Sequence, residues 1–412
     1  MTTEIPESTE VLVVGAGPAG SSAAIWAARA GYDVALVDSA VFPRDKTCGD
    51  GLTPRAMKEL IRLGLGEWAT TRIDNRGLRV AGFGRAAELP WPAGAWEDRG
   101  TAIPRLEFDD KLRCTAVESG ARMSDGTRAV GVEMDGDRVR AVRLQRGEST
   151  CVVRCRSLVV ADGVRSPLGK MLGRVWHRDC VYGIAARAYM KTDRADDRWI
   201  TSHLELRDDA GALQPGYGWV FPLGNGEVNI GVGSLSSAKR PARVQLRPLM
   251  NRYVTQRRAE CETSSDIRSY ASALLPMGGA VSGIAGRNWA LLGDAAACVN
   301  PLNGEGIDYG LESGRMLADV LADPDLSRAW PALLTAEYGT AFSIARRLAD
   351  VATRPHAIGV GGPIAMRSPM MLRLMVRLMG NLVTPEDSDL VAKIWRTAGR
   401  GSTRRDFRPP FT

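Results

Sequence analysis

Glycines and an acid stand at spacings that suit the binding of a dinucleotide. Gly15, Gly17 and Gly20 form the pattern GxGxxG directly after the apolar run 11–14. In this pattern the first glycine permits a tight turn, the second lets the backbone approach a pyrophosphate, and the third lets a helix pack closely. Asp38 ends the next apolar run, where a carboxylate can accept hydrogen bonds from ribose hydroxyls. The spacing predicts a dinucleotide whose phosphates lie at a helix N-terminus.

A cysteine-containing loop follows this pattern almost directly. Residues 42–56 read FPRDKTCGDGLTPRA and place Cys48 close to Lys46 and Arg44. We expect these two cations to lower the pKa of the Cys48 thiol. Because a thiolate is a poor acid, Cys48 is either a group that takes part in the chemistry or one that only shapes a cofactor's surroundings. Both interpretations stay open at this point.

Two distant segments each place an acid beside a glycine at the end of an apolar run. Asp162 and Gly163 follow the run that begins at residue 158, and Gly293 and Asp294 follow the run that begins at residue 289. An acid in such a place can hold ribose or ribityl hydroxyls. The segment NPLNGEGI, residues 300–307, adds backbone amides that can hold a pyrophosphate or the charge of a reduced flavin ring.

Sequence patterns also predict the elements that position these groups. The apolar runs predict buried strands at 11–14 and 32–38. Helices are predicted at 21–30, from the N-cap Thr53 with Pro54 in the first turn, from Arg105, and from about Ile307.

The middle of the chain predicts a sheet. Four alternating segments rich in aromatic and β-branched residues favour antiparallel strands at 182–190, 199–206, 217–224 and 228–235. Tyr217 and Trp219 are two residues apart and should share one face. They either line a pocket beside the cofactor or are plain core aromatics.

Composition limits the function classes. A chain of 412 residues is too long for one ordinary core and indicates more than one domain. The net charge of +7 favours anionic partners, such as a dinucleotide, a diphosphate, nucleic acid or an anionic lipid surface. The odd number of cysteines, seven, has no zinc-type spacing and favours reduced thiols without a metal site. The polar, acidic start is unlike a signal peptide, and no apolar run reaches the roughly 18–20 residues that span a bilayer.

The three glycine–acid motifs, in this order, resemble the flavin signatures of the para-hydroxybenzoate-hydroxylase-like flavoproteins. Within that superfamily, three segments are similar to the geranylgeranyl reductase family: PRDKTCGDGL at 43–52, YGWVFPLGNGEVNIGVG at 217–233, and GDAAACVNPLNGEGI at 293–307. From about residue 10 onward the chain looks like the members of that family that saturate one double bond, the β-isoprene unit, in the menaquinone tail. The resemblance implies bound FAD and an α/β fold: a Rossmann-like FAD-binding domain, an antiparallel β-sheet substrate domain and a C-terminal helical region.

The motifs and the resemblance together suggest the site residues. Those expected to bind the cofactor are Gly15, Gly17, Pro18, Ala19, Gly20, Asp38, Ser39, Arg44, Cys48, Gly49, Asp50, Gly51, Arg105, Asp162, Gly163, Gly293, Asp294, Pro301, Gly304, Glu305, Gly306 and Ile307. Those expected at the catalytic centre are Cys48, Tyr217 and Trp219. The proton donor is not evident, since His177 and His203 lie in polar segments typical of surface or structural histidines.

The expected domain organisation is discontinuous. The FAD-binding domain takes residues 1–75, 103–170 and 280–345, the β-sheet substrate domain takes 76–102 and 171–279, and the helical region takes 346–412.

The helical region contains an unusually apolar stretch. Residues 370–379 are apolar except for Arg373 and Arg377, which share one helix face, and Arg367 lies nearby. Such a helix either lies in a membrane interface or packs against its own domain. Because a long-tailed quinone stays in the bilayer, we expect peripheral association with the cytoplasmic side of the cell membrane.

The expected activity is the FAD-dependent saturation of one isoprenoid double bond of the menaquinone tail. Reduction of an isolated alkene needs a dry, apolar site that holds the double bond against the flavin, and a proton source within reach. The alternatives are reduction of geranylgeranyl diphosphate or another prenyl lipid, FAD-dependent hydroxylation of an aromatic substrate, and a redox sensor that binds quinone or lipid without saturating it. The electron donor, NAD(P)H or another reductant, would bind transiently because no second dinucleotide pattern is present. No nucleic acid partner is expected.

Overall fold

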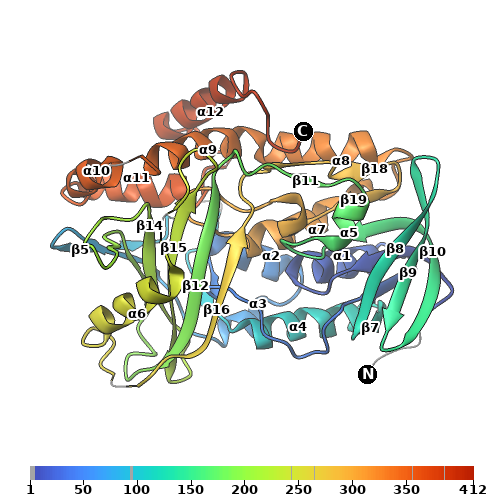
Figure 1. Cartoon of the computed structure of the whole chain (residues 1–412), viewed down its shortest axis with the longest axis horizontal. Helices are drawn as coiled ribbons and strands as arrows, with labels where there is room; N and C mark the ends of the chain where they lie inside the picture. Colours follow the sequence, from blue (N-terminus) through green and yellow to red (C-terminus); the bar gives the residue numbers. More distant parts are fainter. Residues whose placement is uncertain (1–4, 93–95, 243, 264, 355, 385) are drawn as a thin grey trace.

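The structure is a computed structural model that describes residues 5–92, 96–242, 244–263, 265–354, 356–384 and 386–412. Two β-sheets lie side by side, and a row of C-terminal helices runs along the same edge of both (Figure 1). This arrangement confirms the expected fold class, a mixed α/β fold with a helical C-terminal region.

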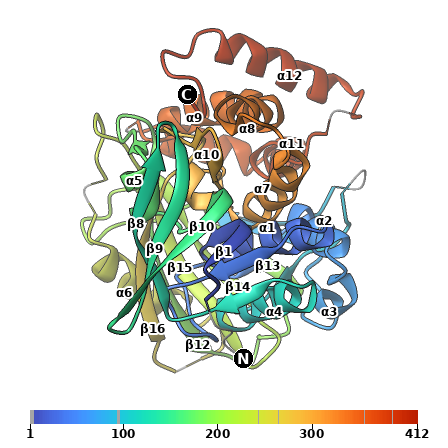
Figure 2. The same cartoon turned by 90° about the vertical axis from the view of Figure 1, so that its right-hand side faces the viewer.

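The first sheet carries the dinucleotide pattern. Its strand order is β18-β19-β10-β1-β2-β7, with β8 and β9 forming an antiparallel extension from β10 (Figure 2). The strands are β1 (Ser8–Val14), β2 (Val34–Val37), β7 (Arg122–Ser124), β8 (Thr127–Asp135), β9 (Arg138–Arg146), β10 (Ser149–Val160), β18 (Ala285–Gly286) and β19 (Trp289–Leu291). The central strands from β19 to β7 run parallel. They are apolar because both faces of such a sheet are covered.

Helices cover this sheet closely. Helix α1 (Pro18–Arg29) starts three residues before the predicted 21–30, because Pro18 suits the first turn of a helix. A Cβ on Gly314 of α7 (Ile307–Val320) would lie 2.7 Å from the backbone of Ala19 and Ala23, so the two helices meet backbone to backbone. The predicted start of α7 at Ile307 and of α4 (Arg105–Glu118) at Arg105 are both confirmed.

The second sheet has the strand order β16-β12-β15-β14-β13-β4-β5. Its strands are β4 (Gly77–Gly82), β5 (Arg85–Pro90), β12 (Tyr182–Lys191), β13 (Trp199–His203), β14 (Gly216–Pro222), β15 (Glu227–Ser236) and β16 (Arg268–Leu275). The four predicted segments are strands of this sheet, and neighbouring strands pair antiparallel except β13 with β4, which pair parallel. The predicted antiparallel pairing of these four strands is confirmed, and the one parallel pair involves β4, which was not among them.

The C-terminal helices cross both halves of the molecule. They are α8 (Leu326–Leu334), the π-helical turn Thr335–Gly339, α9 (Thr340–Ala352), α10 (Ala357–Ala365), α11 (Pro369–Met379) and α12 (Leu390–Thr403). Buried aromatic rings of Tyr309, Tyr338 and Phe342, with centroids 5.1–5.5 Å apart, join α7 to this row. In Figure 1, α10 and α11 lie over the second sheet and α8 lies over the first.

The remaining elements connect these layers. They are β3 (Gly51–Leu52), α2 (Pro54–Arg62), α3 (Gly66–Thr70), β6 (Thr101–Ala102), α5 (Pro167–Met171), β11 (Val175–Trp176), α6 (Leu246–Arg257), β17 (Val281–Ser282) and the 3-10 turn Gly293–Ala296. The division into two discontinuous domains and the helical region 346–412 stays our proposal. Its ranges include residues 1–4, 93–95, 243, 264, 355 and 385, which lie outside the described residues.

Candidate active site

One cavity of about 1710 Å³ runs from the dinucleotide pattern, across the inner face of the second sheet, to the C-terminal helices. All three glycine–acid motifs contribute to its wall, and so do strands β12 to β16 and helices α9 to α11. Most of the wall is apolar. The cavity therefore joins a site for a dinucleotide to a site for a long apolar molecule.

Most predicted site residues meet in this cavity. Those that line it are Gly15, Gly17, Pro18, Ala19, Asp38, Ser39, Arg44, Cys48, Gly49, Asp50, Gly51, Arg105, Asp162, Gly163, Tyr217, Trp219, Gly293, Asp294, Gly304, Glu305, Gly306 and Ile307. Gly20 and Pro301 do not line it. A Cβ on Gly20 would lie 1.7 Å from the Gly15 carbonyl oxygen, so this glycine serves helix packing. Pro301 is buried beside Gly278.

The phosphate end of the cavity fits FAD. Gly17 is the N-cap of α1, and a Cβ there would meet nothing closer than Arg44 at 3.6 Å and Arg105 at 3.9 Å. Both guanidinium groups bind the buried carboxylate of Asp109, at 2.6 Å from each. The open backbone of Gly17, the N-terminus of α1 and two oriented cations form a cradle for an anionic pyrophosphate.

The three predicted acids hold backbone and side-chain groups that shape the cavity. Asp38 accepts hydrogen bonds from the amides of Ala16 at 2.7 Å and Ala40 at 2.8 Å. Asp162 accepts from the Ser166 hydroxyl at 2.5 Å and the Leu168 amide at 2.9 Å. Asp294 lies 3.5 Å from the Lys46 ammonium. Their contact with ribose or ribityl hydroxyls stays a prediction.

The cysteine loop is bound to the second sheet through Asp50. The Asp50 carboxylate accepts from the Tyr189 hydroxyl at 2.7 Å and from the Asn229 amide at 2.9 Å, and Asn229 also donates to the Cys48 carbonyl oxygen. Trp219 donates to the side-chain oxygen of Asn229 at 2.8 Å. This network fixes the backbone at Cys48 against strands β12, β14 and β15.

The expected effect of Lys46 and Arg44 on Cys48 was wrong. Burial raises the pKa of the Cys48 thiol, and this effect outweighs the nearby Arg105 guanidinium, which lowers it. Lys46 and Arg44 are instead paired with Asp294 and Asp109. Cys48 is therefore a neutral thiol at neutral pH in this structure, and its part in the chemistry stays a prediction.

The aromatic residues of β14 form the sheet side of the site. Tyr217, Trp219 and Phe221 follow one face, with neighbouring ring centroids 6.1 and 6.2 Å apart, as expected for residues two apart. The phenol of Tyr217 donates to the Asn303 carbonyl oxygen and so ties the sheet to the loop at 300–307. Phe221 and Trp219 pack over the loop glycines, since a Cβ on Gly49 would lie 3.2 Å from Phe221 and 3.5 Å from Trp219.

Sequence reasoning missed three polar residues of the sheet. Arg187 is 1% exposed, lines the cavity and binds the Asp45 carboxylate at 2.5 Å. Asn229 and Tyr189 hold Asp50, as described above. The available signal was an arginine and an asparagine inside strands whose other residues are mostly apolar, because a buried polar group requires a partner.

Asp50→Asn should remove a pH-dependent loss of stability. Burial raises the pKa of Asp50 to about 6, so the folded chain holds this proton more tightly than the unfolded chain does. The stability that this proton contributes is complete below the unfolded pKa of about 3.9 and is lost as the pH rises through the folded pKa. The shift corresponds to roughly 3 kcal/mol, at 1.36 kcal/mol per pKa unit.

The measurement is urea unfolding of wild type and variant, both saturated with FAD, across the range from acid to mildly alkaline pH. The free energy of unfolding of the variant relative to wild type should increase with pH by about that amount. Parallel curves for the two proteins would show that Asp50 is ionised at its ordinary pKa in the folded chain.

Comparisons with known proteins agree with this geometry. A family model described as "FAD binding domain" matches residues 8–351. A menaquinone reductase of Mycobacterium tuberculosis is 57% identical over 408 residues, which cover 99% of this chain and 100% of the relative. The chain belongs to the FAD-binding family that includes the menaquinone reductases.

A more distant relative and a solved structure of similar fold extend the comparison. A digeranylgeranylglycerophospholipid reductase of Methanopyrus kandleri is 32% identical, over 76% of this chain and 80% of the relative. A solved structure from Thermoplasma acidophilum, a geranylgeranyl bacteriochlorophyll reductase-like protein, has a TM-score of 0.71 at 22% identity and covers 90% of this chain and 99% of its own. The comparisons confirm the expected family and show FAD as the cofactor of the present chain.

Proposed function

We propose that this protein saturates one isoprenoid double bond, in the β-isoprene unit, of the menaquinone tail. The supporting observation is one cavity in which the FAD motifs open onto an apolar sheet face, in a chain 57% identical along its length to a menaquinone reductase. Reduction of geranylgeranyl diphosphate or of another prenyl lipid is the alternative within the family. Hydroxylation of an aromatic substrate is disfavoured, since the relatives at 57% and 32% identity described above are named as reductases.

One set of residues binds the cofactor in this proposal, and another set binds the substrate. Bound FAD, once reduced, supplies a hydride for one alkene carbon. The N-terminus of α1, Arg44 and Arg105 hold its phosphates. Tyr217, Trp219 and Phe221 form an apolar wall that orients the alkene and keeps water out. The electron donor, NAD(P)H or another reductant, binds transiently in this proposal.

The quinone content of cells tests this function. Mass spectrometry of membrane quinones from cells with and without this protein should differ by two hydrogen atoms in menaquinone alone. An unchanged menaquinone together with altered prenyl diphosphates or prenyl lipids would assign the activity to the alternative.

We also propose that the cavity mouth sits on the cytoplasmic surface of the cell membrane. Six apolar side chains of α9, α10 and α11 are 39–77% exposed, and we call them the apolar rim: Leu348, Val351, Val360, Ile364, Met370 and Met371. Leu348, Val351 and Met371 also line the cavity itself. None of the helices in the described part of the chain is long and apolar enough to cross a membrane.

The charges beside the rim differ from the basic stripe that the sequence indicates. Arg377 is paired with Asp387 at 3.1 Å and Asp389 at 2.6 Å. Its charge is therefore neutralised, and it does not extend a basic stripe with Arg373. Leu372 and Val376 are buried, so α11 packs partly against its own domain. Arg354, Arg367 and Arg373 form no ion pair with any described residue and lie in the same segment as the rim. Exposed apolar groups with unpaired cations suit an anionic lipid surface.

A further inference from the structure

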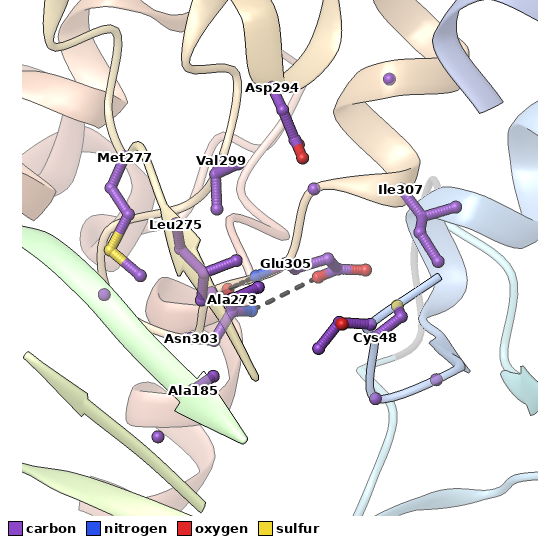
Figure 3. Close-up of a pocket in the computed structure, with 18 of the residues that line it drawn as sticks. Cys48, Ala185, Ala273, Leu275, Met277, Asp294, Val299, Asn303, Glu305 and Ile307 are labelled. Carbon is purple, nitrogen blue, oxygen red and sulfur yellow. Dashed lines mark hydrogen bonds between the residues drawn. The ribbon is translucent and has the colours of Figure 1, made fainter. Parts of the chain in front are cut away.

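A group of four acids lies at and behind the cavity wall opposite Cys48: Glu59 and Asp308 are buried, and Glu305 and Glu312 are half-buried. Glu305 lies in the loop before α7 and lines the cavity, and Figure 3 shows its side chain on the side of the pocket that faces the Cys48 loop. Its carboxyl oxygens accept hydrogen bonds from the Thr53 hydroxyl and, at 3.3 Å, from the Asn303 amide. Thr53 holds the N-cap position of α2, as the sequence predicts, but its hydroxyl binds Glu305 instead of capping the helix.

The charges around Glu305 do not balance. Three more acids lie on the neighbouring helices: Glu59 on α2, and Asp308 and Glu312 on α7. Arg55 is shared by Asp308, at 3.1 Å, and Glu312, at 2.5 Å. Glu59 forms ion pairs with both Arg62 and Arg315. Among the described residues, no cation forms an ion pair with Glu305.

A proton resolves this imbalance. The four carboxyl groups stand beside three guanidinium groups, all of which pair with Glu59, Asp308 and Glu312. One oxygen of Asp308 is also buried with no hydrogen-bond partner among the described residues. Neighbouring carboxylates that share a buried site cannot all ionise. Burial, and then repulsion from Asp308, raise the pKa of Glu305 well above its ordinary value. Burial, with repulsion from Glu312, raises the pKa of Asp308 to about 7 despite the nearby Arg55 guanidinium. The pair therefore keeps a proton at neutral pH.

We propose that Glu305, with Asp308 behind it, donates the proton in the saturation of the alkene. This inference rests on the proposed function. The π bond breaks, one carbon receives a hydride and its electron pair from the reduced flavin, and the other carbon receives the proton of the Glu305 carboxyl. Two C–H bonds form, the flavin is oxidised by two electrons, and the carboxylate regains its proton from solvent.

The other groups near Glu305 are poorer donors. The Cys48 thiol is a weak acid, since burial raises its pKa. Burial also raises the pKa of the Tyr217 phenol, and its proton is donated to the Asn303 carbonyl oxygen. Tyr309 is buried and does not line the cavity, and its hydroxyl accepts a hydrogen bond from the amide of Asn381 at 3.0 Å. Arg55 is held by its two acids and cannot release a proton at neutral pH.

The test uses the FAD-loaded protein, reduced with dithionite and mixed without oxygen with menaquinone in detergent micelles. Glu305→Gln should retain FAD and be reduced normally, yet saturate the menaquinone tail, followed by mass spectrometry of the quinone, about 10²–10⁴-fold more slowly. Glu305→Asp should recover part of the rate. In wild type the rate should fall as the pH rises through the pKa of the pair, and the residual rate of Glu305→Gln should lose this dependence. The exposed Glu337→Gln is the control and should behave as wild type.

A second measurement does not depend on turnover. Infrared spectra of the FAD-loaded protein at neutral pH should contain a carboxylic-acid band that Glu305→Gln or Asp308→Asn removes and Glu337→Gln keeps. A wild-type rate and pH profile in Glu305→Gln, or a band untouched by both substitutions, would overturn the proposal. If wild type does not act on menaquinone at all, the proposed function fails while the infrared result still decides whether the pair holds a proton.

Discussion

Gly17→Val should abolish tight FAD binding and leave the folded chain intact. Gly17 has an extended backbone, with φ −77° and ψ −172°, which any residue adopts. Its nearest neighbours would be 3.6 and 3.9 Å from a new Cβ, an ordinary contact distance. The valine would instead fill the space through which the pyrophosphate reaches the N-terminus of α1. We expect the dissociation constant for FAD to rise at least about 100-fold, or about 2.8 kcal/mol.

Gly20→Ala supplies the contrast. Its Cβ would lie 1.7 Å from the Gly15 carbonyl oxygen, so the chain itself has to shift and should lose its fold rather than only its cofactor. Flavin fluorescence titration and thermal unfolding by circular dichroism separate the two effects. Stoichiometric FAD in purified Gly17→Val would contradict the placement of the phosphates.

Three aspartates in the apolar rim should release the protein from membranes. Val360, Ile364 and Met370 are 64%, 53% and 77% exposed. Val360→Asp, Ile364→Asp and Met370→Asp together should therefore remove apolar contact with the lipid without disturbing the packing of the core. Added negative charge also opposes anionic lipid. We expect flotation with anionic liposomes to be lost and turnover of menaquinone in vesicles to fall by at least about tenfold, a modest effect for three lost apolar anchors.

The matched control is Phe407→Asp. Phe407 is 97% exposed but lies outside the rim, in the segment after α12, and its replacement should leave flotation unchanged. Turnover in detergent micelles should stay normal in the triple variant, because micelles deliver the quinone without a bilayer. Equal flotation of wild type and triple variant would show that the apolar rim does not bind the membrane.

Local patterns carried most of the prediction. The glycine turn, the start of α7 at Ile307 and the same-face pair Tyr217 and Trp219 each depend on residues a few positions apart. Such short-range rules hold because backbone geometry alone decides them. Members of the same motifs then line one cavity because the carboxyl ends of the parallel strands β1, β10 and β19 meet at one edge of the first sheet.

Long-range electrostatics could not be predicted in this way. Near neighbours in the sequence suggested a lowered pKa for Cys48, but Lys46 and Arg44 pair elsewhere and burial dominates. The acids around Glu305 come from α2 (Pro54–Arg62) and α7 (Ile307–Val320), which are far apart in the sequence. No local pattern therefore indicates that they meet. Their charge imbalance becomes visible only when the partners of each guanidinium group are known.

The most direct test of the central claim is the reaction of the purified protein. FAD-loaded protein reduced with dithionite is mixed without oxygen with menaquinone, and the quinone is identified by tandem mass spectrometry. We expect the flavin to be oxidised and menaquinone to gain two hydrogen atoms, located by fragmentation in the second isoprene unit from the ring. A menaquinone tail that stays unsaturated, whether the flavin remains reduced or is oxidised by the quinone ring, would contradict the proposed function.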